Sequence, residues 1–310
     1  MSCDAATTSP YTPICWPAEA LWEVIAPQLP GFTVEMLRSI DSTNSELMRR
    51  FKGSDAVPPQ CAPILLVAEQ QTAGRGRLGR QWVSAPSASL MFSLGLPLAP
   101  QDWSGLSLAV GVSLADSLER AVPTPPQRPR IGLKWPNDLW LSTPDGECKL
   151  GGILVETAPW PDAALSPAST QRFLVIGVGI NITPVVLAGP APTSTQPSVP
   201  PGCLQALFEL QGDGSAADAA QTLLRVVPPL VQAVQAFARF GFAPFQARFA
   251  RRDVLADRLV QLSSGTQGTA HGVTDCGALR VYTASGMQDI TSAEVSVRPA
   301  QPKPMAGGAC

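Results

Sequence analysis

Residues 131–156 read IGLKWPNDLWLSTPDGECKLGGILVE, and this stretch decides the fold. It contains three apolar runs, at 131–134, 138–141 and 151–156, and each is short enough to be a buried strand. Short connections separate the runs, whereas a doubly wound parallel sheet would need a helix between successive strands. The stretch therefore predicts a mixed sheet in an α+β fold.

The same pattern extends in both directions along the chain. Further strands are predicted at 63–68, 89–94 and 173–182. Helices are predicted after a capping sequence at 41–44 and over 104–120, where apolar residues recur at helical spacing. Strands outnumber helices here, which favours one mixed sheet with flanking helices.

Composition suggests three parts of the chain. Residues 1–31 are rich in proline and have room for one short helix at 18–25. Residues 32–250 form the main predicted domain, which includes a proline-rich surface loop at 184–202. Residues 251–310 change to short alternating strands, so a separate small β-barrel is predicted there.

Two local predictions concern the helical region at 204–250. Pro228 and Pro229 are expected to break this helix or to mark its start, because proline removes a helical hydrogen bond. A group of arginines near its end is expected to be a solvated helix end: Arg248, Arg251 and Arg252.

Composition also excludes several classes of function. The 310 residues carry 22 Lys and Arg against 24 Asp and Glu, so a formal net charge of −2 does not argue for nucleic acid as the main partner. His271, expected on or near the surface of a strand, is the one histidine, which excludes a site with two histidine ligands. The seven cysteines form no C-x-x-C pair, so reduced thiols are expected. With no secretory signal and no apolar run of about 18 residues, a soluble cytoplasmic protein is expected.

The most unusual segment, residues 69–82, reads EQQTAGRGRLGRQW and follows a predicted strand. It contains G-x-G-x-x-G, but a dinucleotide site would need a helix to start there, and residues 82–86 do not favour one. We predict a mobile loop whose glycines approach a ligand and whose arginines neutralise phosphate or carboxylate. A solvated basic turn is the alternative.

Four further segments contain groups that could bind a ligand. KWPNDLW at 134–140 places polar side chains at a stiff turn, although a plain hairpin turn would also use Pro-Asn-Asp. KLGGILVE at 149–156 and GVGIN at 177–181 have glycines within strands, which allow a ligand or a backbone to approach closely, or mark a bulge. DSTN at 41–44 either caps a helix or contacts a small polar ring.

Taken in chain order and with their spacing, the five segments at 41–44, 69–82, 134–140, 149–156 and 177–181 resemble the biotin protein ligase family. The resemblance is close over residues 38–182 and continues loosely to residues 294–298. It implies the mixed sheet of the class II synthetase-like biotin and lipoate ligases, followed by a small SH3-like β-barrel. It also implies an ATP-dependent reaction that forms biotinyl-5′-AMP and transfers biotin to a lysine of a biotin carboxyl carrier protein of acetyl-CoA carboxylase.

The resemblance assigns roles by matched position. Arg75 and Lys149 would be catalytic. Biotin would be bound by Ser42, Thr43, Asn44, Gln71, Gly74, Arg75, Gly76, Arg77 and Lys149. ATP would be bound by Arg75, Arg77, Arg80, Trp82, Lys134, Asp138, Lys149, Asn181, Glu294 and Arg298. Mg²⁺ is expected to neutralise the pyrophosphate, with no ligands identified.

Other readings remain. A lipoate or octanoate ligase shares the reaction class, but those enzymes lack the Gly-Arg-Gly-Arg and Lys-Trp-Pro-Asn-Asp segments. A non-catalytic biotin sensor is a second alternative, although a sensor could lose at least one of Arg75, Arg77 and Lys149, and this chain has all three. No winged-helix domain precedes Ser42, so neither a repressor role nor DNA binding is expected, and no membrane partner is expected. Both a monomer and a homodimer are compatible with the sequence.

Overall fold

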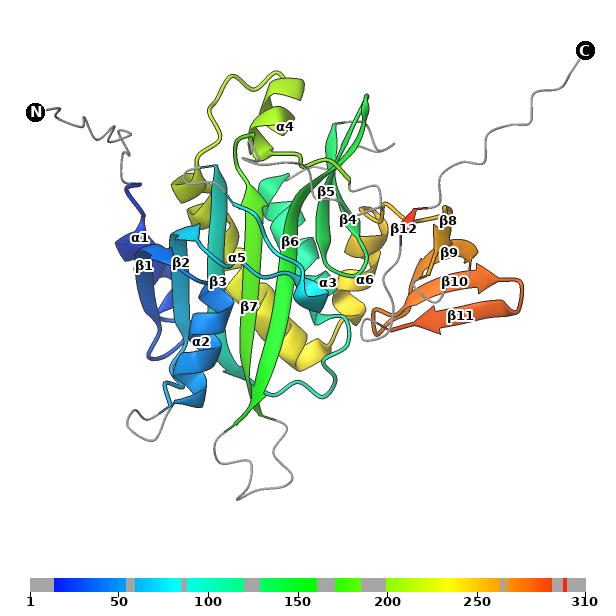
Figure 1. Ribbon diagram of the computed structural model, residues 1–310. Coiled ribbons are helices and arrows are strands. Elements are labelled where there is room, and N and C mark those ends of the chain that lie inside the picture. The colour runs from blue at the N-terminus through cyan, green and yellow to red at the C-terminus, as the bar shows by residue number, and fades with distance from the viewer. Residues whose placement is uncertain are drawn as a thin grey trace, which may run out of the picture.

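A computed structural model describes residues 14–53, 59–84, 88–119, 129–160, 171–184, 199–262, 265, 267–291 and 298–299. Its main feature is a seven-stranded mixed sheet, which confirms the predicted fold class (Figure 1). The order across the sheet is β1 (Thr33–Ile40), β2 (Ile64–Gln71), β3 (Ser89–Leu98), β7 (Arg172–Asn181), β6 (Gly146–Pro159), β5 (Asp138–Thr143) and β4 (Arg130–Lys134). β1 and β2 are parallel, and every other neighbouring pair is antiparallel.

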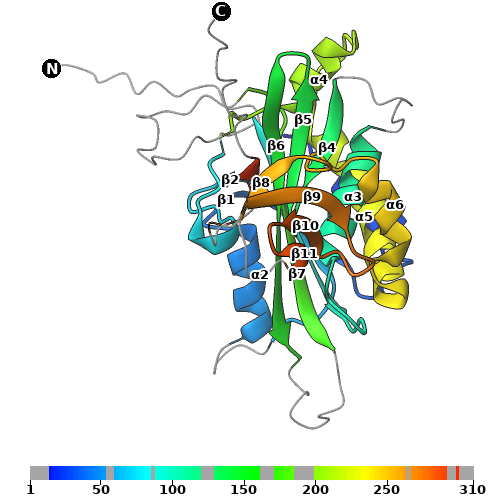
Figure 2. The ribbon, with the colours of Figure 1, turned by 90° about the vertical axis from the view of Figure 1, so that its right-hand side faces the viewer.

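Helices cover both faces of this sheet, as Figure 2 shows. On one face lie α1 (Ala18–Ile25), α3 (Leu106–Leu118), α5 (Ala219–Phe240) and α6 (Ala243–Ala250). On the other face, α2 (Thr43–Lys52) packs Leu47 and Phe51 against Leu66 and Phe173. Because both faces are covered, the central strands are apolar at consecutive positions rather than at alternate ones. The short helix α4 (Leu204–Leu210) lies at one end of the sheet.

The prediction that Pro228 and Pro229 interrupt the helical region is wrong. α5 continues through both prolines. Each proline removes one N–H from the helical ladder, but the apolar face of α5, which includes Leu223, Val227 and Leu230, is fully buried against the core. Tertiary packing of this face outweighs the local cost, as is general for helices in proteins.

A second, antiparallel sheet follows, which agrees with the predicted short alternating strands. Its order is β11 (Gly286–Ile290), β10 (Leu279–Thr283), β9 (Gln267–Val273), β8 (Leu259–Gln261) and β12 (Arg298–Pro299). Residues 292–297, between β11 and β12, lie outside the described residues. The inner residues Val260, Ala270 and Val281 belong to the same hydrophobic cluster as α3 and α5. His271 of β9 lies at the surface with 44% of its side chain exposed, as predicted.

The prediction for the arginines after α6 is correct for Arg251, which is exposed, but wrong for Arg252. Only 1% of Arg252 is exposed. Its guanidinium donates to Asp116 Oδ1 at 2.7 Å and to Glu119 Oε2 and the Ile131 carbonyl at 2.8 Å each. The two acids lie at the end of α3, so the chain folds back against them before it enters the second sheet.

Among the described residues, no helix is both long enough and apolar enough to cross a membrane.

Candidate active site

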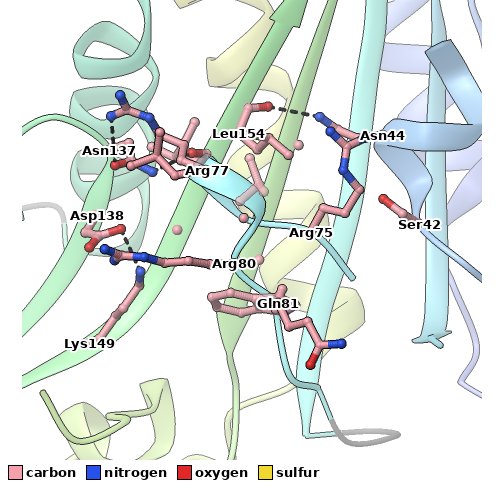
Figure 3. A pocket seen from close by; sticks show the side chains of 18 of the residues that line it. Ser42, Asn44, Arg75, Arg77, Arg80, Gln81, Asn137, Asp138, Lys149 and Leu154 are labelled. Carbon is pink, nitrogen blue, oxygen red and sulfur yellow. Dashed lines mark hydrogen bonds and ion pairs between the residues drawn. The ribbon is translucent and has the colours of Figure 1, made fainter. Parts of the chain in front are cut away.

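A cavity of about 160 Å³ lies on the α2 face of the main sheet. Figure 3 shows its two ends: Ser42, Asn44 and Arg75 lie near α2, whereas Arg77, Asp138 and Lys149 lie at the opposite end of the cavity. Most of the residues predicted for the site line it: Ser42, Thr43, Asn44, Gln71, Arg75, Gly76, Arg77, Arg80, Trp82, Lys134, Asp138 and Lys149. The fold therefore brings the separate sequence segments together.

Four predicted residues are not in this lining. Gly74 and Asn181 lie close by, with other contacts. Glu294 is outside the described residues, and only the backbone of Arg298 is described, in β12.

The α2 end of the cavity is formed by the start of the helix and the end of β2. Ser42 is the N-cap residue of α2, and its hydroxyl accepts a long hydrogen bond of 3.4 Å from the Ser45 amide. Gln71 Oε1 accepts from the Thr43 amide at 2.7 Å and from the Thr43 hydroxyl at 3.2 Å. The DSTN segment therefore caps a helix, as predicted, and Ser42, Thr43 and Asn44 also line the cavity; contact with a small polar ring stays a prediction.

Asn44 is buried, and its amide is held on both sides by the protein. Its Oδ1 lies 2.6 Å from the Ser93 hydroxyl, which is also 2.7 Å from Thr43 Oγ1. Its Nδ2 donates to the Leu154 carbonyl at 3.2 Å and to Glu156 Oε2 at 3.0 Å. Sequence reasoning missed Ser93; the signal was a hydroxyl between Phe92 and Leu94 in the middle of the apolar strand β3.

The glycines of β7 make room for the chain's own side chains. A Cβ on Gly177 would overlap the Asn44 amide, and one on Gly179 would lie 2.6 Å from the Trp82 ring. The prediction for GVGIN is that a ligand or a backbone approaches these glycines, and the approach of a ligand stays a prediction. In this structure, the groups that approach are Asn44 and Trp82.

The segment 74–82 folds back on itself as a tight loop. The Trp82 amide donates to the Gly74 carbonyl at 2.9 Å, and the Gly76 amide donates to the Arg80 carbonyl at 2.7 Å. A Cβ on Gly74 would lie 2.6 Å from the Trp82 carbonyl, so this glycine permits the closure. No α-helix begins here, as predicted; the tip is a single 3₁₀ turn at Arg77–Gly79.

Cations dominate the lining of the cavity. Five basic side chains face it: Arg75, Arg77, Arg80, Lys134 and Lys149. Among the described lining residues, Asp138 is the one acid. A chain with a net charge of −2 thus concentrates positive charge at one place, which suits a ligand with several negative charges.

Two of these cations contact the KWPND turn. Lys149 Nζ lies 2.7 Å from Asp138 Oδ1, and Arg77 donates to Asn137 Oδ1 over 3.4 Å. Burial lowers the pKa of the Arg77 guanidinium below its ordinary value, with nearby Asp138 opposing and Arg80 adding to this effect. Arginine nevertheless stays protonated at neutral pH.

The KWPND turn is itself fixed by hydrogen bonds to other parts of the protein. Trp135 is buried, and its indole Nε1 donates to the Gly277 carbonyl of the second sheet's β9–β10 loop at 3.0 Å. Asn137 Nδ2 donates to the Ile153 carbonyl at 2.8 Å, and the Ile153 amide donates to the Asn137 carbonyl at 3.0 Å. The Trp135–Pro136 peptide is cis. The turn therefore does more than connect two strands, because it fixes Asp138 opposite Lys149.

Asn181 acts outside the cavity. Its Nδ2 donates to the Gly202 carbonyl at 2.9 Å and to the Lys149 carbonyl at 3.4 Å. The Lys149 amide in turn donates to the Pro200 carbonyl at 2.9 Å. The end of the proline-rich segment therefore lies along β6 beside Lys149, and Asn181 fastens it there.

No cluster of three or more His, Cys, Asp or Glu side chains suited to a metal ion occurs within the described part of the chain.

Comparisons with known proteins show what this chain is similar to. The model of the Biotin/lipoate A/B protein ligase family matches residues 36–181, and that of the Biotin protein ligase C terminal domain matches residues 260–298. The Bifunctional ligase/repressor BirA of Escherichia coli is 32% identical over 283 residues, which cover 88% of this chain and 77% of that protein.

Two further matches cover almost the full length of the other protein. A Biotin--[acetyl-CoA-carboxylase] ligase of Paracoccus denitrificans is 28% identical over 268 residues, which cover 84% of this chain and 98% of that protein. The biotin protein ligase from Aquifex aeolicus, solved in complex with biotin and ATP, superposes with a TM-score of 0.63 at 25% identity, covering 86% of this chain and 99% of that one.

Proposed function

Because the chain belongs to the Biotin/lipoate A/B protein ligase family, we propose that it is an ATP-dependent biotin ligase. In this proposal it forms biotinyl-5′-AMP and then biotinylates a lysine of the biotin carboxyl carrier protein of acetyl-CoA carboxylase, the substrate class in the name of the Paracoccus relative. The observation that carries the proposal is the cavity, where five cations face one acid beside a cluster of uncharged polar groups.

The first step joins two anions, so the cations have a direct task. A carboxylate oxygen of biotin attacks the α-phosphorus of ATP, and the bond to the bridging oxygen breaks with release of pyrophosphate. Lys149 would bridge the carboxylate and the α-phosphate, where negative charge develops in the transition state. Arg75 would cover the same two groups, and Arg77 would contact the triphosphate.

The second step transfers the acyl group. The neutral amine of the acceptor lysine attacks the carbonyl carbon of the mixed anhydride, AMP leaves, and the nitrogen loses its proton to form the amide. The cations that stabilised the first step would here stabilise the leaving phosphate. Closure of the 74–82 loop, predicted from sequence to be mobile, over the adenylate would exclude water from the anhydride.

The α2 end of the cavity suits the ring of biotin. The ureido group is neutral and carries both donors and an acceptor, so it is matched by hydroxyl and amide groups rather than by charges. Ser42, Thr43 and Gln71 offer such groups next to one another. Asn44 would help by fixing the wall, since its own amide is already bonded to the protein on both sides.

Mg²⁺ also belongs to the proposal. Mg²⁺ commonly uses one or two carboxylates together with substrate phosphates and water. Asp138 is the acid that faces the cavity among the described residues, and it could hold an ion carried by the phosphates. When bound, the ion would neutralise the pyrophosphate leaving group.

The remaining assignments follow from the resemblance. On the nucleotide side we propose Arg80, Trp82, Lys134, Asn181, Glu294 and Arg298. We also propose that the catalytic domain spans 32–250 and the SH3-like domain 251–310. Because the reaction consumes ATP, the proposal includes a cytoplasmic location.

A transfer assay tests the function. The protein is mixed with biotin, ATP, Mg²⁺ and a recombinant biotin carboxyl carrier domain, and the acceptor is weighed by intact mass spectrometry. One biotin adduct, lost with Lys149→Ala and Arg75→Ala, is the expected result. Modification of a lipoyl domain instead would identify a lipoate ligase, and biotin binding with no adduct on either acceptor would identify a sensor.

A further inference from the structure

Glu156 of β6 is the last residue of the KLGGILVE segment, and the proposed reaction gives it no role. Its two carboxylate oxygens have different partners: Oε1 lies 2.7 Å from a terminal nitrogen of Arg75, and Oε2 accepts 3.0 Å from Asn44. We propose that Glu156 is a positioning residue that acts through Arg75 and Asn44 to set the affinity for biotin. This inference rests on the proposed function.

Glu156 stands at one end of a series of close polar contacts, in which the two hydroxyl protons of Ser93 and Thr43 serve two of the three contacts at a time. From Glu156 the contacts pass through Asn44 to the hydroxyl of Ser93, then to the hydroxyl of Thr43 and finally to Gln71. The distances along this path are 3.0, 2.6, 2.7 and 3.2 Å. One carboxylate therefore connects the arginine that would cover the biotin carboxylate with the groups that would bind the ring.

The two partners of Glu156 depend on it to different degrees. Asn44 is 3% exposed and has further bonds, whereas 45% of the Arg75 side chain is exposed. Apart from Glu156, the bonded partner of Arg75 in the described structure is the Ser45 hydroxyl, 3.0 Å from its other terminal nitrogen. An arginine has many rotamers, and fixing it costs entropy that a strong, charge-assisted contact must offset.

The geometry leaves Arg75 able to bind while it is held. A guanidinium has five N–H donors, and the contacts to Glu156 and Ser45 use two of them. Glu156 and Ser45 thus hold the two terminal nitrogens, and the remaining donors are available to an anion in the cavity that Arg75 lines.

Both partners of Glu156 are donors, so the position requires two acceptors. A carboxylate provides them, whereas the amide of glutamine provides one oxygen and places an NH₂ group against the other donor. In Glu156→Gln the oxygen should stay with the buried Asn44, because a buried amide without a partner is the costlier alternative. The substitution therefore removes the Arg75 contact selectively.

The experiment measures the dissociation constant for biotin by calorimetry without ATP, and thermal melting of each variant. Glu156→Gln should weaken biotin binding about tenfold, the size expected from one charge-assisted hydrogen bond. In an Arg75→Gln background the same change should alter binding by less than about twofold, because the partner is already gone. Ser45→Ala, which removes the second contact of Arg75 at the surface of α2, should weaken binding in the same direction.

Glu35→Gln is the matched control, since Glu35 is a strand carboxylate that also pairs with an arginine of α2, Arg50, outside the cavity. It should leave biotin binding unchanged. Wild-type affinity in Glu156→Gln, or an equal tenfold loss in the Arg75→Gln background, would overturn the inference. A wild-type protein that fails the transfer assay would instead refute the proposed function.

Discussion

Gly177→Ala should damage the cavity from within the central strand of the sheet. β7 is paired along its length with β3 and β6, so its backbone has little freedom to move. A Cβ at this position would overlap the amide oxygen of Asn44 and lie 2.8 Å from its Cγ. Since ordinary contacts of this kind begin near 3.4 Å, Asn44 must move away.

The cost follows from what Asn44 would lose. Its amide bonds to Ser93, to the Leu154 carbonyl and to the charged Glu156. A neutral hydrogen bond contributes about 1 kcal/mol net, and one to a charged group about 1.5–3 kcal/mol. With partial relaxation of α2, the free energy of unfolding should fall by about 3 kcal/mol, which corresponds to roughly 6–10 °C in Tm for a domain of this size.

Urea unfolding followed by circular dichroism measures the stability, and calorimetry measures biotin binding, which should weaken in parallel. Gly214→Ala is the control, because a Cβ there meets no atom within 4 Å. In an Asn44→Ala background, Gly177→Ala should cost less than about 1 kcal/mol, since the clashing side chain is gone. Wild-type Tm and wild-type biotin affinity in Gly177→Ala would refute the role given to Asn44.

Three further outcomes are expected. Ser93→Ala should weaken biotin binding about tenfold by calorimetry, because both Thr43 and Asn44 lose a partner, whereas Ser89→Ala on the same strand removes a buried hydroxyl without a described partner and should change little. Arg252→Met should lower the free energy of unfolding in urea by about 3–5 kcal/mol, since Glu119 is left buried without its cation, and Arg251→Met at the exposed neighbour should stay within about 0.5 kcal/mol. Burial raises the pKa of Asp253 to about 6, so folding favours the protonated carboxyl. The stability that this proton contributes is complete when the pH lies below the ordinary pKa of an aspartate, and it is lost as the pH rises through about 6. Asp253→Asn should therefore add about 2 kcal/mol above neutral pH and flatten the pH dependence of urea unfolding between about pH 4 and 7; an unchanged profile would refute this.

The sequence predicted those parts of the fold that depend on local pattern. The strands at 131–134, 138–141 and 173–182 and the buried helix within 104–120 all appear, because apolar period and turn chemistry are local properties. The segments of the site were also found locally, from unusual glycines and cations placed next to strands.

What sequence reasoning missed depends on contacts between distant segments. The charge of Arg252 suggested solvent, but Asp116 and Glu119 lie more than 130 positions away and could not be matched to it beforehand. Pro228 and Pro229 were judged by local cost, without the packing that offsets it. Ser93 gained its role through Thr43 and Asn44, about 50 positions earlier in the chain.

The hydrogen bond from Trp135 to the Gly277 carbonyl has a consequence for how freely the two sheets can be recombined. The β9–β10 loop that carries Gly277 packs against Gly105, at the start of α3, and against Leu108. A C-terminal sheet taken from another protein would have to reproduce this contact, or the turn that carries Asp138 would lose its support. The second sheet thus supports the turn at the cavity through this contact, and natural or engineered fusions should preserve the pair as one unit.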